Sequence, residues 1–504
     1  MSAGLVSIEE ISKHDSPSDC WLVIDNQVWD MTEFAPSHPG GPGIIHRYAG
    51  RDATQAYSEV HAPSVIKDNL AATKLKGRLD PSTINDEWLK PPPTAPQANT
   101  PAGDNSQPDL DTIINAHDFE LAAQKTATAK TWAFYSSGAN DLITRDANAS
   151  LYSRIWFRPR VMRNVRTVST SSTILGLPTT LPILISPAAM AKLIHPDGEL
   201  AIARAAHSKG IIQCISTGAS YPAAEIVTSI PSSPTSGSQH PFFFQLYVDK
   251  QRSKSAALLQ KLHQHGNIRA IFVTADAAAA GKREADERLR ADESLASPIT
   301  GVAARNDNKG GGYGRVMGGF IDPSLHWGDI AWLRAQTRLP LVLKGVMSAS
   351  DVKLACHHGL DGVMLSNHGG RNLDTSPPAI LTLLECHRRC PEVFASLDIY
   401  IDGGIRRGSD VLKCVALGAT AVGLGRPVLF ATAYGQQGVE HLIDILQDEL
   451  EVAMRNCGVT SLEEVGPWLV NTADLDHLVP AEEAHPYARD WRRGKRERGI
   501  KAKL

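Results

Sequence analysis

Short apolar runs alternate with amphipathic segments along most of the chain from residue 182 onward. The apolar runs end in small or polar residues, and the segments between them, such as 199–209, 350–358 and 408–417, carry apolar residues at helical spacing. Eight strands that alternate with helices favour an α/β fold with a closed (β/α)8 TIM barrel over an open doubly wound sheet. The predicted strands are 182–186, 211–215, 242–248, 270–274, 340–343, 362–365, 399–401 and 421–424.

Polar residues cluster where these runs end. In a (β/α)8 barrel the chemistry lies just beyond the C-terminal ends of the strands, so these residues would share one face of the molecule. Random scatter would put about half of them at the other end. The residues in question are Ser216, Gln245, Tyr247, Thr274, Asp276, Lys344, His368, Arg371, Asp402 and Arg426.

The predicted strand 362–365 is followed by Ser-Asn-His-Gly-Gly-Arg at 366–371. Imidazole titrates near neutrality, so His368 can take a proton from a substrate, and Arg371 can hold a carboxylate through two parallel hydrogen bonds. That pair suits a 2-hydroxy acid. Asp276 can orient His368 and stabilise its protonated form. The alternative is a turn with two glycines and no catalytic role.

Two glycine-rich loops, 402–408 and 423–427, follow the last two predicted strands. Glycine lets backbone amides approach an anion, and barrel enzymes commonly hold phosphate in these two loops. The loops therefore predict a phosphate-bearing cofactor, with tight turns and solvated arginines as the alternative. Lys344 ends another strand, where its charge would stabilise a reduced flavin, unless it is a salt-bridged core lysine.

The segment 277–339 is the longest interruption of the barrel pattern. A connection of this length in a compact barrel is usually a lid or disordered. Its glycines at 310–314 do not form a dinucleotide fingerprint, because no strand precedes them and no acidic ribose ligand follows. The absence of a Gly-x-Ser-x-Gly elbow disfavours hydrolysis.

Length and charge narrow the class of protein. With 504 residues, of which 42% are hydrophobic, we expect two or three domains. The net charge of −3 gives no electrostatic case for nucleic acid or an anionic membrane. No apolar run approaches the roughly 20 residues of a membrane span, and the N-terminus has no signal-peptide pattern, so we expect a soluble intracellular protein.

The chain divides at a segment rich in proline and small polar residues, 81–110, which predicts an extended linker. The linker would separate a small domain, residues 1–80, from a barrel domain, residues 111–480. A basic tail would follow at 481–504.

Two histidines distinguish the small domain. His38 lies directly before a Pro-Gly-Gly turn, and His61 follows 23 residues later. Two histidines in loops that bound short helices can ligate one haem iron from both faces. His46 competes for the second position, but it follows His38 so closely that it would not reach the opposite face.

The small domain resembles cytochrome b5. The matching segments are Trp-Leu-Val-Ile at 21–24, Asp-Met-Thr-Glu-Phe at 30–34, His-Pro-Gly-Gly at 38–41 and Gly-Arg-Asp-Ala-Thr at 50–54. The resemblance implies a small α+β fold that binds haem b, with His38 and His61 as the iron ligands.

The barrel domain is similar, over 134–469, to the FMN-dependent 2-hydroxy-acid dehydrogenases and oxidases. The motifs that carry this resemblance are Tyr-Ser-Ser-Gly-Ala at 135–139, Gln-Leu-Tyr at 245–247, Thr-Ala-Asp at 274–276, Lys-Gly at 344–345, the hexapeptide and both glycine loops. It implies that His368 is the base, held by Asp276, and leaves open whether the base takes the hydroxyl proton or the carbon-bound proton.

The same resemblance implies a site for each ligand. The residues implied at the substrate and in catalysis are His368, Asp276, Tyr135, Tyr247, Lys344, Arg283 and Arg371. The residues implied at FMN are Ala188, Ala189, Ser216, Gln245, Thr274, Lys344, Asp402, Gly403, Gly404, Arg406, Gly425 and Arg426.

Two positions depart from the family pattern. Ala188 stands where relatives often have threonine, and Gly218 stands where they carry a bulkier side chain directed at the substrate. Less side chain leaves more room, so we expect the enzyme to accept a 2-hydroxy acid larger than lactate.

The fusion as a whole resembles the flavocytochrome b2 family, the L-lactate dehydrogenases of the cytochrome type. FMN takes two electrons, while a bis-histidine haem passes one at a time and leaves no open position for oxygen. The resemblance therefore implies electron flow from an L-2-hydroxy acid through FMN and haem to a one-electron acceptor such as cytochrome c. An FMN oxidase with an accessory haem domain is the closest alternative, and a non-catalytic sensor is a more distant one.

Assembly and location follow less directly. The family resemblance implies a homotetramer. The end of the chain, Ala-Lys-Leu at 502–504, resembles a peroxisomal address, and no Arg-rich presequence precedes the haem domain. We expect a cytoplasmic or peroxisomal protein, with the mitochondrial intermembrane space as the location that the resemblance adds.

Overall fold

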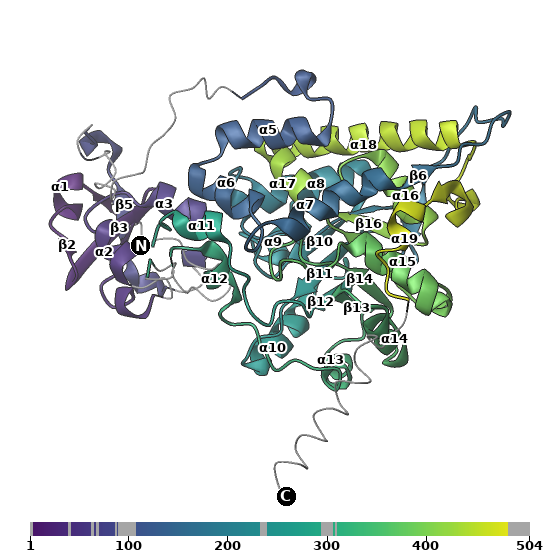
Figure 1. The fold of residues 1–504 in the computed structure, drawn as a ribbon. Coiled ribbons are helices and arrows are strands. Elements are labelled where there is room, and N and C mark those ends of the chain that lie inside the picture. Colours follow the sequence, from purple (N-terminus) through teal and green to yellow (C-terminus); the bar gives the residue numbers. More distant parts are fainter. Residues whose placement is uncertain are drawn as a thin grey trace, which may run out of the picture.

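The computed structural model describes residues 4–38, 42–61, 65–66, 70–85, 88, 107–231, 239–293, 306–307 and 310–481. Figure 1 shows a small N-terminal domain, in purple, beside a much larger domain in blue to yellow. Most of the predicted linker and all but the first residue of the predicted tail lie outside the described residues.

The N-terminal domain has a mixed sheet of five strands in the order β1-β5-β4-β3-β2. Successive residues of β3 point to opposite faces of the sheet. Leu22 therefore packs with Trp29 and Ile45 on the face covered by α2 and α3, while Val23 packs with Val28 on the other face. The elements are β1 (Leu5–Val6), α1 (Ile8–Ile11), β2 (Asp15–Ser16), β3 (Asp19–Ile24), β4 (Gln27–Asp30), α2 (Pro42–Arg47), α3 (Thr54–Val60) and β5 (Leu75–Leu79).

Packing of this domain continues beyond residue 80. Trp88 is only 8% exposed, lies in the cluster that contains Ile8 and Ile11, and donates from Nε1 to the Gly50 carbonyl at 3.0 Å. The start of the proline-rich segment is therefore part of the domain surface.

The large domain is a closed barrel of parallel strands, which confirms the predicted fold class. β16 pairs with β9, through Val422 and Ile183, and closes the cylinder. All eight predicted strands are present, with ends that differ by a few residues at most. The strands are β9 (Ile183–Ile185), β10 (Ile212–Ser216), β11 (Phe242–Leu246), β12 (Ile268–Thr274), β13 (Leu341–Val346), β14 (Gly362–Leu365), β15 (Asp398–Asp402) and β16 (Ala421–Leu424).

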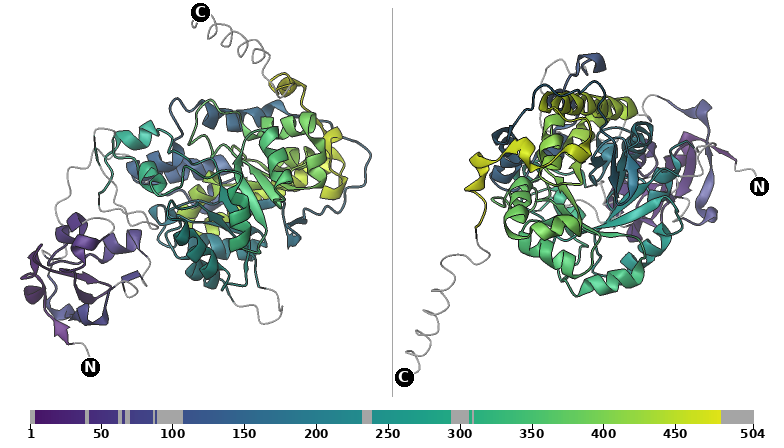
Figure 2. Two further views of the ribbon diagram at one scale, coloured as in Figure 1. Left: turned by 90° about the horizontal axis from the view of Figure 1, so that it is seen from below. Right: turned by 90° about the vertical axis from the view of Figure 1, so that its right-hand side faces the viewer.

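The barrel strands are buried on both faces, which explains why they read as continuous apolar runs. Inside the cylinder, Phe243, Phe272 and Tyr400 pack in one cluster, and a second, larger cluster lies between the strands and the outer helices. The outer helices form a ring around the sheet (Figure 2). They include α8 (Gly198–Lys209), α10 (Arg252–Leu262), α14 (Ala349–His357), α15 (Ala379–Arg389), α16 (Gly408–Ala416) and α18 (Gly435–Cys457).

The segment expected to be a lid or disordered is largely structured where it is described. It contains α11 (Glu284–Arg288), α12 (Tyr313–Gly318) and α13 (Asp329–Gln336), while 294–305 and 308–309 lie outside the described residues. Lys130, in the helix Ala129–Ser136, binds α11. Its ammonium group contacts the Asp286 carboxylate at 2.5 Å and donates to the Leu289 carbonyl at 3.1 Å. Among the described residues, no helix has both the length and the apolar character needed to cross a membrane.

Candidate active site and haem site

The hexapeptide 366–371 forms a tight turn at the end of β14. His368, Gly369 and Gly370 all have positive φ values of 59°, 65° and 74°. Positive φ is costly for histidine and is found where a site requires it. Ser366 Oγ accepts from the His368 amide at 3.1 Å, and Asn367 Oδ1 accepts from the Gly370 amide at 3.1 Å. The turn is therefore held by its own side chains, with the imidazole projecting from it.

His368 lies between Asp276 and Tyr247. Its Nδ1 is 3.0 Å from Asp276 Oδ1, and its Nε2 is 3.3 Å from the Tyr247 hydroxyl. The carboxylate accepts from Nδ1–H, so Nε2 carries the lone pair that faces the cavity. Burial lowers the pKa of His368 below its ordinary value, against the opposing effect of Asp276. His368 is therefore a neutral base at pH 7.

Asp276 is poised to stabilise a protonated His368. Burial raises its pKa, but the His368 ring and Lys344 outweigh burial, so that the pKa lies below the ordinary value. Gly345 makes the approach possible, because a Cβ there would lie 2.6 Å from Asp276 Cβ and Cγ. In the Lys-Gly pair at 344–345, Lys344 thus supplies the charge and Gly345 leaves room for Asp276.

Two arginines, the buried Arg283 and the half-buried Arg371, face the same cavity as His368. The guanidinium carbons of Arg283 and Arg371 lie 5.6 Å and 5.8 Å from the centre of the Phe134 ring. Burial, followed by the charges of Arg426 and Arg283, lowers the pKa of Arg371 well below its ordinary value. Burial also lowers the pKa of Arg426 to about 10. Concentrated positive charge of this kind is stabilised by an anion.

Lys344 lies two residues before the C-terminal end of β13 and lines the cavity. Its Nζ donates to Ser366 Oγ at 2.8 Å and lies 3.4 Å from Asp402 Oδ2. Asp402 Oδ2 also accepts from Ser186 Oγ at 3.2 Å. Lys344 therefore forms a salt bridge, as expected of a core lysine. It also lines the cavity, as a lysine that stabilises a reduced flavin must.

Tyr135 is placed differently from Tyr247. Its hydroxyl lies 2.6 Å from the Met190 carbonyl and 3.0 Å from the Ala189 carbonyl, and the side chain is only 1% exposed. The single hydroxyl proton is thus donated to the backbone of the β9 loop. Tyr135 can still meet a substrate as a hydrogen-bond acceptor.

The Tyr-Ser-Ser-Gly-Ala motif joins this tyrosine to the 366–371 turn. The Ala139 amide donates to the Gly370 carbonyl at 2.7 Å, and a Cβ at Gly138 would lie 2.8 Å from the same carbonyl oxygen. Arg426 donates to the carbonyls of Tyr135 and Ser137 at 2.9 Å and 2.6 Å. The motif therefore has a structural explanation in the close contact of two loops.

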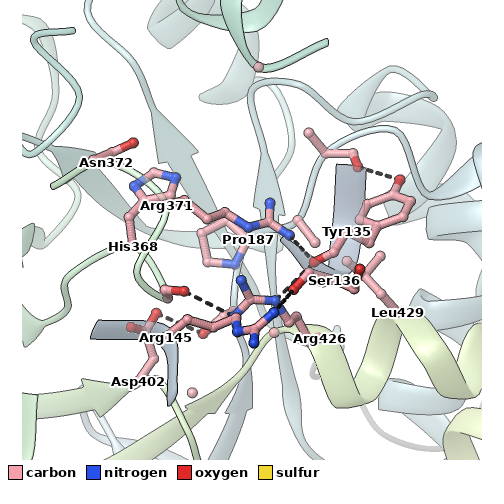
Figure 3. A pocket seen from close by; sticks show the side chains of 18 of the residues that line it. Tyr135, Ser136, Arg145, Pro187, His368, Arg371, Asn372, Asp402, Arg426 and Leu429 are labelled. Atoms are coloured by element: carbon pink, nitrogen blue, oxygen red, sulfur yellow. Dashed lines mark hydrogen bonds between the residues drawn. The ribbon is translucent and has the colours of Figure 1, made fainter. Parts of the chain in front are cut away.

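A cavity of about 730 Å³ connects these groups at the C-terminal ends of the strands. In Figure 3, His368 and Arg371 lie on one side of the cavity, and Arg145 and Arg426 lie below them. Every residue expected at the substrate and at FMN lines the cavity except Asp276, which supports His368 from behind. The residues concerned are Tyr135, Ala188, Ala189, Ser216, Gln245, Tyr247, Thr274, Arg283, Lys344, His368, Arg371, Asp402, Gly403, Gly404, Arg406, Gly425 and Arg426.

The cavity suits FMN. Asp402 Oδ1 and Arg283 Nε are buried without a hydrogen-bond partner among the described residues, which calls for a polar ligand. The space next to Gly425 is open, since a Cβ there would meet nothing within 4 Å. Arg406, which also pairs with Glu120 at 3.0 Å, and Arg426 line the cavity, where they could bind a phosphate.

Gly218 is not among the described residues that line the cavity. Its carbonyl accepts from the Met190 amide at 3.0 Å, so the glycine lies next to the loop that carries Ala188 and Ala189. Gly218 could therefore affect the size of the accepted substrate only through the loop that it contacts. That effect stays a prediction.

His38 and His61 face each other in the N-terminal domain. His38 follows a 3-10 turn, η1 (Ala35–Ser37), and His61 follows α3. Their ring centres are 6.1 Å apart. Two metal–nitrogen bonds of about 2 Å, with roughly 1 Å from each nitrogen to its ring centre, span about 6 Å. The spacing thus fits one iron between the rings.

The surroundings of His61 favour iron binding. Burial, together with His38 and Lys192, lowers the pKa of His61 to about 4, so the ring is neutral and can act as a ligand. His46, the competing residue, lies in α2, and the His38 ring contacts the rings of Phe34 and His61. The Pro-Gly-Gly turn at 39–41 lies outside the described residues.

Several supporting residues were not predicted from the sequence. Asn148 and Asn367 exchange two amide hydrogen bonds of 2.8 Å and connect α7 (Ile143–Ser150) to the 366–371 turn. Asn372 Nδ2 donates to the Asp276 carbonyl at 2.7 Å. The ring of Phe134 lies against the guanidinium groups of both Arg283 and Arg371. The only signal for these residues in the sequence was proximity to the motifs.

The family follows from comparison with known proteins. Residues 123–472 match the FMN-dependent dehydrogenase family, and residues 7–80 match the cytochrome b5-like heme/steroid binding domain. The chain therefore belongs to the FMN-dependent dehydrogenases and carries a cytochrome b5-like domain in front of the barrel.

Among its relatives, the chain is similar to L-lactate dehydrogenase (cytochrome) of Saccharomyces cerevisiae, with 40% identity over 94% of this chain and 81% of the yeast protein. It is 37% identical to glycolate oxidase of Spinacia oleracea, which covers 70% of this chain. A solved structure of a mutant flavocytochrome b2 with pyruvate bound covers 76% of this chain and 92% of its own, with a TM-score of 0.65 and 39% identity.

These matches confirm the predicted cofactors and class of enzyme. The chain is an FMN- and haem-dependent oxidoreductase of the flavocytochrome b2 type. The relative with the oxidase name matches 70% of this chain, whereas the yeast relative matches 94% of it, a share that spans both domains.

Proposed function

We propose that the enzyme oxidises an L-2-hydroxy acid, L-lactate or a larger analogue, to the 2-oxo acid and passes the electrons through its haem to a one-electron carrier such as cytochrome c. The observation that carries this proposal is the meeting of His368, Arg283 and Arg371 in one cavity with Lys344. The name of the yeast relative and the pyruvate in the related structure support lactate as the first substrate to test.

The proposed roles follow from the geometry. Arg283 and Arg371 bind the substrate carboxylate, and Tyr247 donates a hydrogen bond to its hydroxyl oxygen. His368 Nε2 accepts the proton that the substrate gives up, and Asp276 stabilises the resulting imidazolium. Bound FMN supplies the two-electron acceptor for this oxidation.

The chain would hold FMN by both of its ends. Lys344, with Gln245 and Thr274 beside it, would bind the ring, and the Lys344 charge would favour electron uptake. Arg406 and Arg426 would bind the phosphate. This division of the cavity leaves Ala188 and Ala189 as its apolar wall.

His38 and His61 would bind haem b from both faces. A haem held by these two histidines would supply one-electron transfer, and histidine on both faces would leave no position for oxygen. This arrangement favours a cytochrome as acceptor over oxygen, which the alternative, an FMN oxidase with an accessory haem domain, would use.

Assembly and location complete the proposal. We infer a homotetramer from the family resemblance, and a cytoplasmic or peroxisomal location; residues 502–504, which resemble a peroxisomal address, lie outside the described residues. The mitochondrial intermembrane space is the location that the family resemblance would favour.

A steady-state assay with two acceptors tests the proposed function. The holoenzyme is given L-lactate, D-lactate or L-mandelate with cytochrome c in air, and both cytochrome c reduction and hydrogen peroxide are measured. We expect turnover with L-lactate or L-mandelate, none with D-lactate, and almost no peroxide. Peroxide formed in proportion to substrate would favour the oxidase, and the absence of turnover with all three acids would contradict the proposed substrate class.

A further inference from the structure

The two domains meet where α3 ends. Val60, the last residue of α3, is 6% exposed and packs in the hydrophobic cluster that surrounds the barrel strands. The carbonyl of His61 accepts a hydrogen bond from Lys192 Nζ at 3.2 Å. Lys192 lies in η6 (Ala191–Leu193), the turn that follows β9. The contact therefore joins a proposed iron ligand to the rim of the barrel.

The turn that carries Lys192 is firmly held. The Lys192 amide donates to Ser220 Oγ at 3.2 Å, and the Ala191 amide donates to Glu199 Oε1 at 2.9 Å. The Lys192 ammonium also lies 4.9 Å from the centre of the Tyr221 ring. Since both backbone and side chain are fixed, the ammonium group points in a defined direction before the haem domain binds.

The same stretch of chain forms a wall of the flavin cavity. Ala188 and Ala189 line the cavity, and the carbonyls of Ala189 and Met190 contact the Tyr135 hydroxyl. One fixed segment thus runs from the cavity wall to Lys192.

We infer that Lys192 is a positioning residue for electron transfer between the cofactors, because it holds the His61 loop against the segment that forms the flavin wall. The inference rests on the proposed function. Each transfer that depends on this contact takes one electron from the reduced flavin and converts ferric haem to ferrous haem. Two transfers, separated by reoxidation of the haem by the external carrier, return the flavin to its oxidised state.

A second contact between the domains can be compared with that of Lys192. Arg47 lies 3.8 Å from Asp292, and both side chains are partly exposed. An exposed pair at this distance contributes little, whereas Lys192 makes a charge-assisted hydrogen bond beside a buried apolar contact. Arg47→Met should therefore affect docking less than Lys192→Met.

Anaerobic stopped-flow measurements on the full holoenzyme test the inference. After mixing with L-lactate, flavin bleaching and haem reduction are followed at separate wavelengths. Lys192→Met is expected to slow haem reduction about tenfold and to leave flavin reduction within about twofold, because one charge-assisted hydrogen bond is lost. Lys192→Arg keeps the charge and should stay within about threefold of the wild type.

The matched control is Lys209→Met, because Lys209 pairs with Asp444 within the barrel domain at 2.7 Å. It should leave both phases unchanged. Haem reduction as fast in Lys192→Met as in the wild type would overturn the inference, and so would equal slowing in Lys209→Met.

Hydrogen exchange gives a readout that does not depend on turnover. In the full-length holoenzyme, Lys192→Met should raise the exchange of the α3 amides about tenfold and leave the barrel strands unchanged. Unchanged exchange in α3 would overturn the docking role. If the wild type shows no flavin reduction with any 2-hydroxy acid, the proposed function fails, while hydrogen exchange still decides whether Lys192 holds the haem domain.

Discussion

The barrel and the haem domain position their chemistry in different ways. In the barrel, most groups around the cavity come from the ends of parallel strands, and several are held by further polar contacts, as Lys344 is by Ser366 and Asp402. In the haem domain, two histidines at the ends of short helical segments face each other with their ring centres 6.1 Å apart. The barrel site is preorganised by contacts between its own side chains, whereas the histidine pair would be completed by haem.

This difference predicts that the two sites fail independently. Replacing His61 with alanine removes one of the two proposed iron ligands, so we expect loss of bound haem and complete loss of cytochrome c reduction. Flavin reduction by L-lactate should stay within about twofold, because the barrel site is built from its own residues. Absorption spectra and stopped-flow measurements check both outcomes.

His46→Ala is the control for that experiment, since His46 was the other candidate ligand. It should keep its haem. Haem retention in His61→Ala together with haem loss in His46→Ala would show that the second ligand is His46.

The converse change concerns the barrel. His368→Gln removes the base but keeps a polar side chain of similar size, and we expect flavin reduction to fall about 10⁴-fold with FMN still bound. His357→Gln, at an exposed position at the end of α14, is the matched control. Substantial flavin reduction in His368→Gln would remove the role of His368 as the base.

A smaller effect is expected for the residue behind the base. Asp276→Asn should lower kcat/KM about 10²- to 10³-fold, because the imidazolium loses its partner. The active form has neutral His368, so kcat/KM rises with pH through the pKa of His368, which burial places below its ordinary value. The acid limb should therefore lie below about pH 6.5 in the wild type.

Asp276 raises the pKa of His368, so its removal should move the acid limb to still lower pH. A pH profile of kcat/KM for both enzymes checks the direction. A limb that moves to higher pH in Asp276→Asn would contradict the assigned partnership.

The smallest expected effect tests how closely the barrel site is packed. In Gly345→Ala, a new Cβ would lie 2.6 Å from Asp276, so we expect kcat to fall about tenfold as the carboxylate is displaced. Gly359→Ala is a matched control, because Gly359 also has a positive φ, of 64°, but no atom lies within 4 Å of its Cβ position. Equal losses in both variants would point to backbone strain alone.

The two regions also differ in what the sequence could reveal. The barrel strands were predicted because parallel strands buried on both faces read as uninterrupted apolar runs, and the site followed from their ends. The interactions of Phe134, Gly345 and the Asn148–Asn367 pair join segments far apart in the chain, so no local pattern marks them. Tyr135 was expected at the substrate, yet its hydroxyl proton is used by the backbone of another loop.

Structure within 277–339 was underestimated for a related reason. Its helices α11 and α12 are short, and they are held by contacts such as that of Lys130 with Asp286 rather than by an apolar period of their own. In the haem domain, the histidines could be recognised from the motif around them, but their facing geometry depends on the packing of α3.

An anaerobic reductive titration of the purified holoenzyme with L-lactate tests the central claim most directly. If substrate electrons pass through both cofactors of one chain, the flavin band should bleach, the bands of ferrous haem should appear, and each chain should take up three electrons, two at FMN and one at haem. Bleaching of the flavin while the haem stays ferric would contradict the account.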